Sequence, residues 1–166
     1  DRGPYQGILY QTARVLAESP TLAEAAPRML EAVCQALGWQ YGAIWEVDHA
    51  RNVLQFVGLY QPPSEPFGEF AAVSRRSTFT PGIGLPGRVW ASGEPLWIPD
   101  VTRDSNFPRA EAAQRSGLHA AFGLPIRQGA KVMGVLEFFN RDILQPTPEL
   151  LLMMTTVGRQ IGLFVE

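Results

Sequence analysis

The sequence holds very few of the side chains that most often bind metals or act as nucleophiles. Its 166 residues include one cysteine, Cys34, and two histidines. A single cysteine excludes an internal disulfide framework and a multi-cysteine zinc site, and it fits a protein of the reducing cytoplasm. No convincing Ser/His/Asp or Cys/His arrangement is present, since Cys34 lies on the apolar stripe of a predicted helix. We therefore predict no catalytic residue, no metal site and a non-enzymatic function.

The chain also lacks an excess of charge and a long hydrophobic run. Charged residues make up 18% of the total and the formal net charge is −2, which gives no electrostatic basis for binding nucleic acid or an anionic membrane. No apolar run reaches the eighteen or so residues that span a bilayer, and the N-terminus lacks a signal-peptide pattern. We expect a cytoplasmic domain without nucleic-acid or membrane contact. Because the chain starts at Asp1 and stops at Glu166 within an apolar-periodic run, we also expect a longer protein with an output domain in cis.

Length and patterning predict a single α+β domain over residues 1–166. Apolar residues at helical spacing indicate helices towards both ends, and Thr21 with Glu24 forms a capping box at the start of the second helix. Runs rich in aromatic and branched residues indicate strands, and the last of these is apolar on both faces, which places it near the centre of a sheet. Long helices are predicted at 5–18, 21–37 and 147–166, short helices at 69–74, 85–91 and 109–115, and strands at 39–47, 53–60, 96–98, 118–126 and 131–140, with the sheet and its pocket loops together covering 39–140.

Glycines, prolines and two tryptophans are concentrated in residues 82–100. Turn formers at this density force repeated chain reversals beside aromatic residues that still need a core. The segment is therefore either the wall of a cavity or a tightly packed connection. Gly82, Gly84 and Gly87 match the letters of a dinucleotide-binding fingerprint, but no buried strand precedes them and no long helix follows, which argues against a phosphate-binding turn.

Two polar residues stand out within predicted strands. Glu137 lies inside the most apolar run of the chain, and a buried carboxylate is costly unless it is paired or hydrogen-bonded. We expect it to face a polar pocket or an arginine such as Arg88, with exposure at a sheet edge as the alternative. His119 opens a strand near the predicted cavity, where it is a ligand contact, a haem ligand or a hydrogen-bonded wall residue.

The last helix carries apolar residues at the alternating spacing of four and three that is typical of a helix–helix seam. A second apolar flank indicates that the helix has two packing partners. Either one partner is the sheet and the other a second subunit, or the helix packs against the first two helices only. The seam predicted for a homodimer consists of Leu150, Met154, Val157, Ile161 and Phe164.

Four segments and the order of the predicted elements strongly resemble a GAF domain. They are residues 82–89 (GIGLPGRV), 93–101 (GEPLWIPDV), 123–126 (GLPI) and 134–139 (GVLEFF). The resemblance implies a profilin- or PAS-related central antiparallel sheet of five or six strands, with the terminal helices on one face and a loop-enclosed pocket on the other. It also implies a sensory module of a bacterial signalling protein, such as a histidine kinase or a cyclic-dinucleotide enzyme.

Subclasses of the family differ in residues that this sequence lacks. Phytochrome-like members hold a bilin through a pocket cysteine, and here His119 has no cysteine near it, which argues against covalent bilin. Members that bind cyclic nucleotides carry a signature after the last strand that only Asn140 and Arg141 match loosely, so cyclic nucleotide is disfavoured and the cofactor is left open. The free methionine sulfoxide reductases of this fold work through several cysteines, which one cysteine does not provide.

We therefore expect a non-catalytic domain that binds a small molecule and transmits a conformational change through its terminal helices to an output domain such as a histidine kinase. The alternative is a ligand-free structural dimerisation or relay domain whose pocket is filled by its own Trp90, Trp97, Phe107 and Phe122. The candidate ligand-binding residues are Arg88, Trp90, Trp97, Phe107, His119, Phe122 and Glu137.

Overall fold

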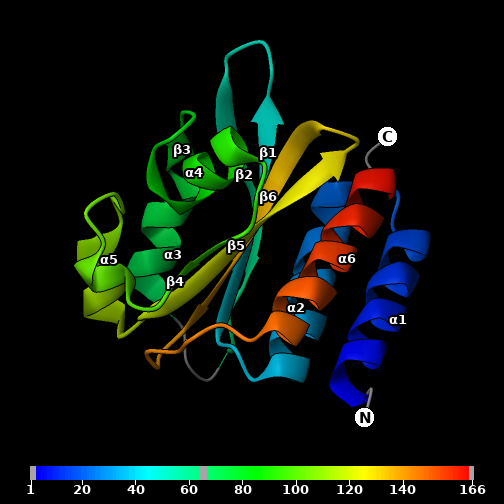
Figure 1. Ribbon diagram of the computed structural model, residues 1–166, viewed down its shortest axis with the longest axis horizontal. Helices are drawn as coiled ribbons and strands as arrows, with labels where there is room; N and C mark the ends of the chain where they lie inside the picture. Colours follow the sequence, from blue (N-terminus) through cyan, green and yellow to red (C-terminus); the bar gives the residue numbers. More distant parts are fainter. Residues whose placement is uncertain (1–2, 64–66, 165–166) are drawn as a thin grey trace.

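A six-stranded antiparallel sheet lies between two layers of helices in the computed structural model, which describes residues 3–63 and 67–164 (Figure 1). The order across the sheet is β3-β2-β1-β6-β5-β4, so β1 and β6 occupy the centre, as predicted for β6. This confirms the predicted fold class. The strands are β1 (Tyr41–Asp48), β2 (Val53–Tyr60), β3 (Thr78–Phe79), β4 (Leu96–Ile98), β5 (Ala120–Gln128) and β6 (Lys131–Asn140).

Two hairpins supply the four long strands. In the β1–β2 turn the Asp48 carboxylate accepts hydrogen bonds from the backbone N–H groups of Ala50 and Arg51, and Asn52 takes a left-handed conformation at φ 57°. Asparagine and aspartate favour such turns because their side chains hydrogen-bond the local backbone. Gly129 supplies the left-handed residue of the β5–β6 turn at φ 61°. Both hairpins were predicted from the spacing of the apolar runs.

Three long helices, α1 (Gly3–Glu18), α2 (Leu22–Leu37) and α6 (Pro148–Phe164), cover one face of the sheet. The predicted cap of α2 is confirmed, since Thr21 Oγ1 accepts a hydrogen bond from the Glu24 N–H at 3.2 Å. Gly38 ends that helix at φ 73° and donates its N–H to the Cys34 carbonyl. None of the helices in the described part of the chain is both long and apolar enough to cross a bilayer.

The apolar stripe of α6 packs inside the domain, which corrects the predicted dimer seam. Met154, Val157 and Ile161 are fully buried and Leu150 is nearly so, all in the core that α1, α2 and α6 form with the sheet; Phe164 is half-buried against the same core. A helix that packs on a sheet buries the same spacing of residues as a helix that packs on a helix, so the spacing did not identify the partner. Two glycines of α6 allow this close packing: a Cβ at Gly158 would lie 2.7 Å from the Pro125 carbonyl oxygen, and one at Gly162 would collide with the Arg127 carbonyl.

The opposite face of the sheet carries the short elements: α3 (Gly68–Arg75), α4 (Gly84–Ser92), the 3-10 turn η1 (Val101–Arg103) and α5 (Ala110–Ser116). β3 and η1 were not predicted because, unlike β4, whose three residues are all apolar, they contain polar side chains. The strands predicted to begin at Trp39 and Leu118 begin two residues later. Trp39 belongs to the helix-side core instead.

Candidate functional site

Glu137 is fully buried at the centre of the sheet and faces the layer of short helices. Its neighbours across β6 are small: Ala43 on β1 and Gly123 on β5 stand opposite it in register. Gly123 leaves room for α4, because a Cβ there would lie 3.0 Å from Val89 and 3.2 Å from Leu85. The local sequence therefore opens space above an acidic side chain in the middle of the apolar sheet.

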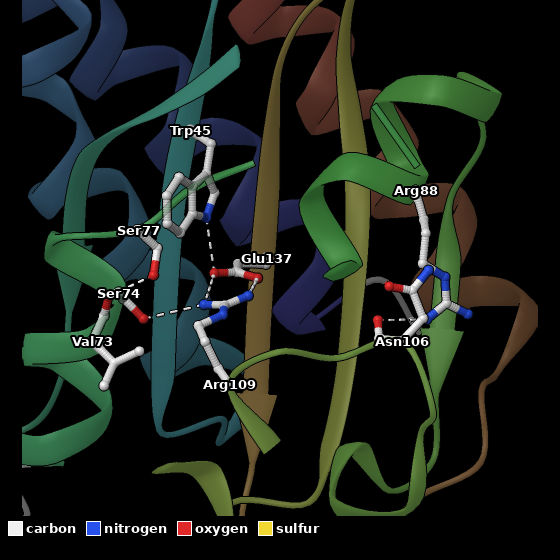
Figure 2. Close-up of polar contacts among 8 residues, drawn as sticks. All are labelled: Trp45, Val73, Ser74, Ser77, Arg88, Asn106, Arg109 and Glu137. Carbon is white, nitrogen blue, oxygen red and sulfur yellow. Dashed lines mark hydrogen bonds and ion pairs between the residues drawn. The ribbon is translucent and has the colours of Figure 1, made fainter. Parts of the chain in front are cut away.

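The partner of Glu137 is Arg109, not Arg88, which corrects that part of the sequence-based expectation. Arg109 immediately precedes α5 and is only 2% exposed. Its Nη1 and Nη2 donate to the two Glu137 carboxylate oxygens, both at 2.8 Å, and Nη1 also donates to Ser74 Oγ of α3 at 3.1 Å (Figure 2). Trp45 Nε1 of β1 donates to Glu137 Oε2 at 2.8 Å. The two hydrogen bonds from Arg109 to Glu137 have the parallel geometry in which a guanidinium matches a carboxylate.

Aromatic rings surround the guanidinium of Arg109. Five ring centroids lie between 5.0 and 5.6 Å from its central carbon, within the range of cation–π attraction. We call the whole arrangement the Arg109 box. It consists of Glu137, Ser74 and the rings of Trp45, Phe70, Phe79, Phe107 and Phe139, together with the Arg109 guanidinium that they enclose.

Burying this ion pair carries a large desolvation cost, which the parallel hydrogen bonds offset only if both partners stay in place. Two polar atoms at the box have no hydrogen-bond partner among the described residues: Nε of Arg109 and the hydroxyl of Tyr41. Burial raises the pKa of the Tyr41 hydroxyl well above its ordinary value, although the nearby Ser74 opposes the shift. The phenol is therefore neutral at physiological pH. The box is a charged and incompletely satisfied centre within an otherwise apolar layer.

Arg88 of α4 holds the loop between η1 and α5, beside the box. Its Nη1 lies 2.8 Å from Asp104 Oδ1 and donates to the Asn106 carbonyl at 3.3 Å. The Asn106 side chain accepts from the Gly84 N–H and donates to the Gly82 carbonyl, so it holds the turn that begins α4. Gly82 and Gly84 have φ angles of 86° and 70°, which confirms that these glycines reverse the chain. Figure 2 shows Arg88 and Asn106 to one side of the Arg109 box.

Two other candidate residues lie on the same face of the sheet as Glu137. Phe107 is 4% exposed and is one wall of the box, and Trp90 is half-buried against the same core. His119 lies at the rim, with its Nδ1 3.0 Å from Asp100 Oδ1 and one third of its side chain exposed. Burial of Asp100 acts to raise its carboxyl pKa, but hydrogen bonds from Thr102 and His119 outweigh burial and lower it. The structure therefore shows His119 hydrogen-bonded at the rim of this face, and its contact with a ligand stays a prediction.

Trp97 and Phe122 lie on the opposite face of the sheet, so the seven candidates do not form one cluster. Their rings stack 5.2 Å apart in the helix-side core, with Trp39 edge-on to both. Trp97 Nε1 donates to the Leu144 carbonyl at 2.8 Å, which holds the chain before α6. Trp97 lies on this face because side chains alternate along a strand. Leu96 and Ile98 face the short helices, so Trp97 between them faces the other way.

No group of three or more His, Cys, Asp and Glu side chains in the described part of the chain is arranged to hold a metal ion. Cys34 is fully buried on the helix side of the sheet, and burial raises the pKa of its thiol far above the ordinary value. A separate open cleft of about 960 Å³ lies between α6 and the end of β5. The residues around the cleft include Pro95, Arg127, Gln128, Thr155, Arg159 and Leu163.

Sequence comparison matches the model of the GAF domain to residues 19–166. The chain is 32% identical over 83 residues to the anthocyanin regulatory Lc protein of Zea mays, a match that covers 49% of this chain and 13% of that protein. It is 29% identical over 91 residues to the HTH-type transcriptional activator RamA of Corynebacterium glutamicum, which covers 54% and 29%. The matched segments span less than a third of either relative.

Solved structures of similar fold include the A. aeolicus nlh2 GAF domain in an inactive state, at a TM-score of 0.77 and 22% identity, covering 98% of this chain and 95% of that one. The free methionine-R-sulfoxide reductase of Neisseria meningitidis in complex with its substrate has a TM-score of 0.77 at 17% identity and covers 96% and 87%. At these identities the likeness establishes the fold.

Proposed function

The chain belongs to the GAF domain family, and on this premise we propose that it is a non-catalytic regulatory module of a longer, cytoplasmic signalling protein. The module binds a small molecule on the face of the sheet that carries the short helices. Binding changes the packing of α6, which passes the change to an output domain such as a histidine kinase. The observation that carries this proposal is the buried Arg109 box, which lies beneath the loops of that face.

A buried ion pair is a poor device for stability alone. Replacing such a pair with apolar residues of similar volume is often neutral or stabilising, so stability does not explain why the charges are present. Ligand sites, by contrast, combine apolar and aromatic walls with a few convergent polar groups. The five rings, the Glu137 carboxylate and the Ser74 hydroxyl have that composition. The box is therefore the best candidate for the ligand-responsive centre.

A route for the signal runs from the box to α6 through backbone contacts. Glu137 of β6 pairs in register with Gly123 of β5. Further along β5, the Pro125 and Arg127 carbonyls meet Gly158 and Gly162 of α6 with no space for a Cβ. Displacement of β5 would therefore move α6 directly. A ligand shifts this packing only if it binds one arrangement more tightly than the other.

The related proteins support a regulatory role and a small ligand. The two sequence relatives are named as a regulatory protein and as a transcriptional activator, and the nlh2 GAF domain is described in an inactive state. The N. meningitidis enzyme of this fold is described with its substrate bound. That enzyme also raises the question of catalysis. We propose no catalysis for this chain because Cys34 is buried away from the box.

A homodimer through the terminal helices forms part of the proposal, with contacts other than the predicted seam. Leu152 and Leu163 of α6 are 71% and 70% exposed, and Tyr10 of α1 is 65% exposed. α1 and α6 lie side by side and run in the same direction (Figure 1). We assign these side chains to a second copy of the chain. Leu163→Glu should lower the association state in sedimentation, while Ile143→Glu, in the exposed loop before α6, should not.

A second candidate, a ligand-free relay domain, is favoured by one observation. The Arg109 guanidinium and its aromatic neighbours fill the space around Glu137 with the chain's own side chains. In that case the domain transmits force between its neighbours in the full protein, and no small molecule enters. The prediction that Trp90, Trp97, Phe107 and Phe122 fill the pocket is wrong in part. Trp97 and Phe122 lie on the other face of the sheet.

Thermal melting against a metabolite panel distinguishes the two functions. Sensing predicts a concentration-dependent rise in Tm for at least one compound among cyclic nucleotides, haem, tetrapyrroles, amino acids and organic anions. Thr155→Glu, which alters the separate cleft, should keep the response, whereas Phe107→Ala, which opens the box, should change its midpoint. A flat response to the whole panel would favour the relay function.

A further inference from the structure

Arg109 occupies its site as a bound ligand would. Its guanidinium makes three hydrogen bonds, to Glu137 and Ser74, and is enclosed by five aromatic rings. The residues that hold it come from β1, β3, β6, α3 and the loop before α5, whereas Arg109 itself comes from the edge of a seven-residue helix. Apart from Phe107, which lies in the same loop as Arg109, the residues that form the site belong to other parts of the fold than their occupant.

The site requires a planar cation. Without Arg109 the Glu137 carboxylate would keep one hydrogen bond, from Trp45, in a fully buried position. Its two oxygens face two N–H groups that are fixed side by side, a pattern that guanidinium and amidinium groups supply and an ammonium group does not. The surrounding rings add attraction for positive charge of any kind. Shape and charge together therefore select guanidino compounds over amines.

The attachment of Arg109 is weaker than its site. α5 buries only the small side chains of Ala112 and Ala113, and its ion pair to α3, from Arg115 to Glu69, is exposed and adds little stability. The buried Nε–H of Arg109 has no acceptor among the described residues, so the tethered side chain does not satisfy all of its own donors.

We propose that the Arg109 box is a binding site for guanidino and amidino compounds, with Arg109 as its tethered resident and α5 as the element that moves when an outside ligand replaces it. This inference rests on the proposed sensing function and specifies its ligand class. The tether places Arg109 at a high effective concentration, so an outside ligand competes at a disadvantage in the wild-type protein. Removal of the Arg109 side chain removes that competition.

Ligand rescue of Arg109→Ala tests the proposal. Ethylguanidinium is the probe, ethylammonium the matched cation, and urea the matched planar neutral compound, each at 10 mM. A dissociation constant of about 1 mM predicts a rise in Tm of roughly 3–5 °C with ethylguanidinium. The other two compounds should leave Tm unchanged, and adding Glu137→Gln to the variant should abolish the response. Equal responses to all three compounds, or a response that survives Glu137→Gln, would overturn the proposal.

A second measurement uses the wild-type protein and does not depend on the variant folding. The indole N–H of Trp45 reports on Glu137 in a proton–nitrogen correlation spectrum, because the two groups are hydrogen-bonded. Titration with ethylguanidinium should shift this signal together with the amide of Gly117, which ends α5, while ethylammonium should shift neither. An unmoved Trp45 signal refutes the guanidino class. A melting response to another compound would still leave the sensing function standing.

Discussion

Arg109→Met tests the energetics of the buried pair. Methionine is unbranched and apolar, so it occupies much of the arginine stem without its charge. The change leaves the fully buried Glu137 carboxylate with Trp45 as its one remaining donor. Breaking a buried pair by removing one partner costs about 3–5 kcal/mol, because the other charge is left uncompensated. Glu137→Leu should cost a similar amount, since it strands the guanidinium.

The double variant Arg109→Met/Glu137→Leu separates the interaction from the burial of either group. With both charges gone the residual loss should be about 1–2 kcal/mol, chiefly from the Trp45 indole N–H that loses its acceptor. The double variant should therefore be more stable than either single variant. Urea unfolding followed by circular dichroism gives the free energies. In a domain of this size, each single variant should lower Tm by roughly 6–20 °C.

The chain offers an exposed ion pair between α5 and α3 as a control. Arg115 of α5 lies 2.9 Å from Glu69 of α3, but both side chains are largely exposed. Arg115→Met, Glu69→Leu and the double change should leave Tm nearly unaltered, because water screens an exposed pair. If the losses at Arg109 and Glu137 simply add in the double variant, the pair is not coupled and the reasoning about the box is refuted.

Three further predictions concern other parts of the fold. Gly162→Ala should lower the free energy of unfolding by about 1–3 kcal/mol, because the new Cβ meets the Arg127 carbonyl; a rise in Tm, as at an ordinary helical glycine, would contradict this packing. Cys34, whose thiol pKa is raised by burial, should react with a disulfide reagent only at the rate of unfolding, and rapid labelling of the native protein would show that the burial is wrong. Asp100 has a folded pKa below its unfolded value of about 3.9, so the stability that it contributes is complete above that value and is lost as pH falls through the folded pKa. The free energy of unfolding should therefore decline more steeply below pH 4 in the wild type than in Asp100→Asn, and equal slopes would show that the His119 and Thr102 contacts do not hold the carboxylate.

The long elements were predictable because each carries several periods of its pattern. The four long strands, the two hairpins that they form and the capped second helix follow from such repeats. The packing partner of α6 did not follow, since a stripe with spacing of three and four fits a sheet as well as a helix. Gly158 and Gly162 are the residues in the sequence that indicate the packing partner of α6. Small residues four apart on one helix face indicate a very close neighbour, which here is the backbone of β5.

The candidate site was only partly predictable for a related reason. The face on which an aromatic residue lies is clear in a long strand and ambiguous in one of three residues, so Trp97 was assigned to the wrong side. Arg109 was missed because a charged residue at the start of a polar helix is normally solvated. Only the rings of Trp45, Phe70 and Phe107, brought together by the fold, distinguish it from any surface arginine.

Glu137 nevertheless indicated that a polar pocket or a cation lies beside it, because an acid within a buried strand must be compensated. What the sequence could not identify is the residue that supplies the cation. Arg88 of α4 pairs with Asp104, and the fold brings in Arg109 instead. The acid is therefore fixed on the central strand, while its partner is carried by a short peripheral helix. An ion pair divided in this way between a rigid and a weakly anchored element links the edge of the domain to its centre, which is the property that a regulatory domain needs.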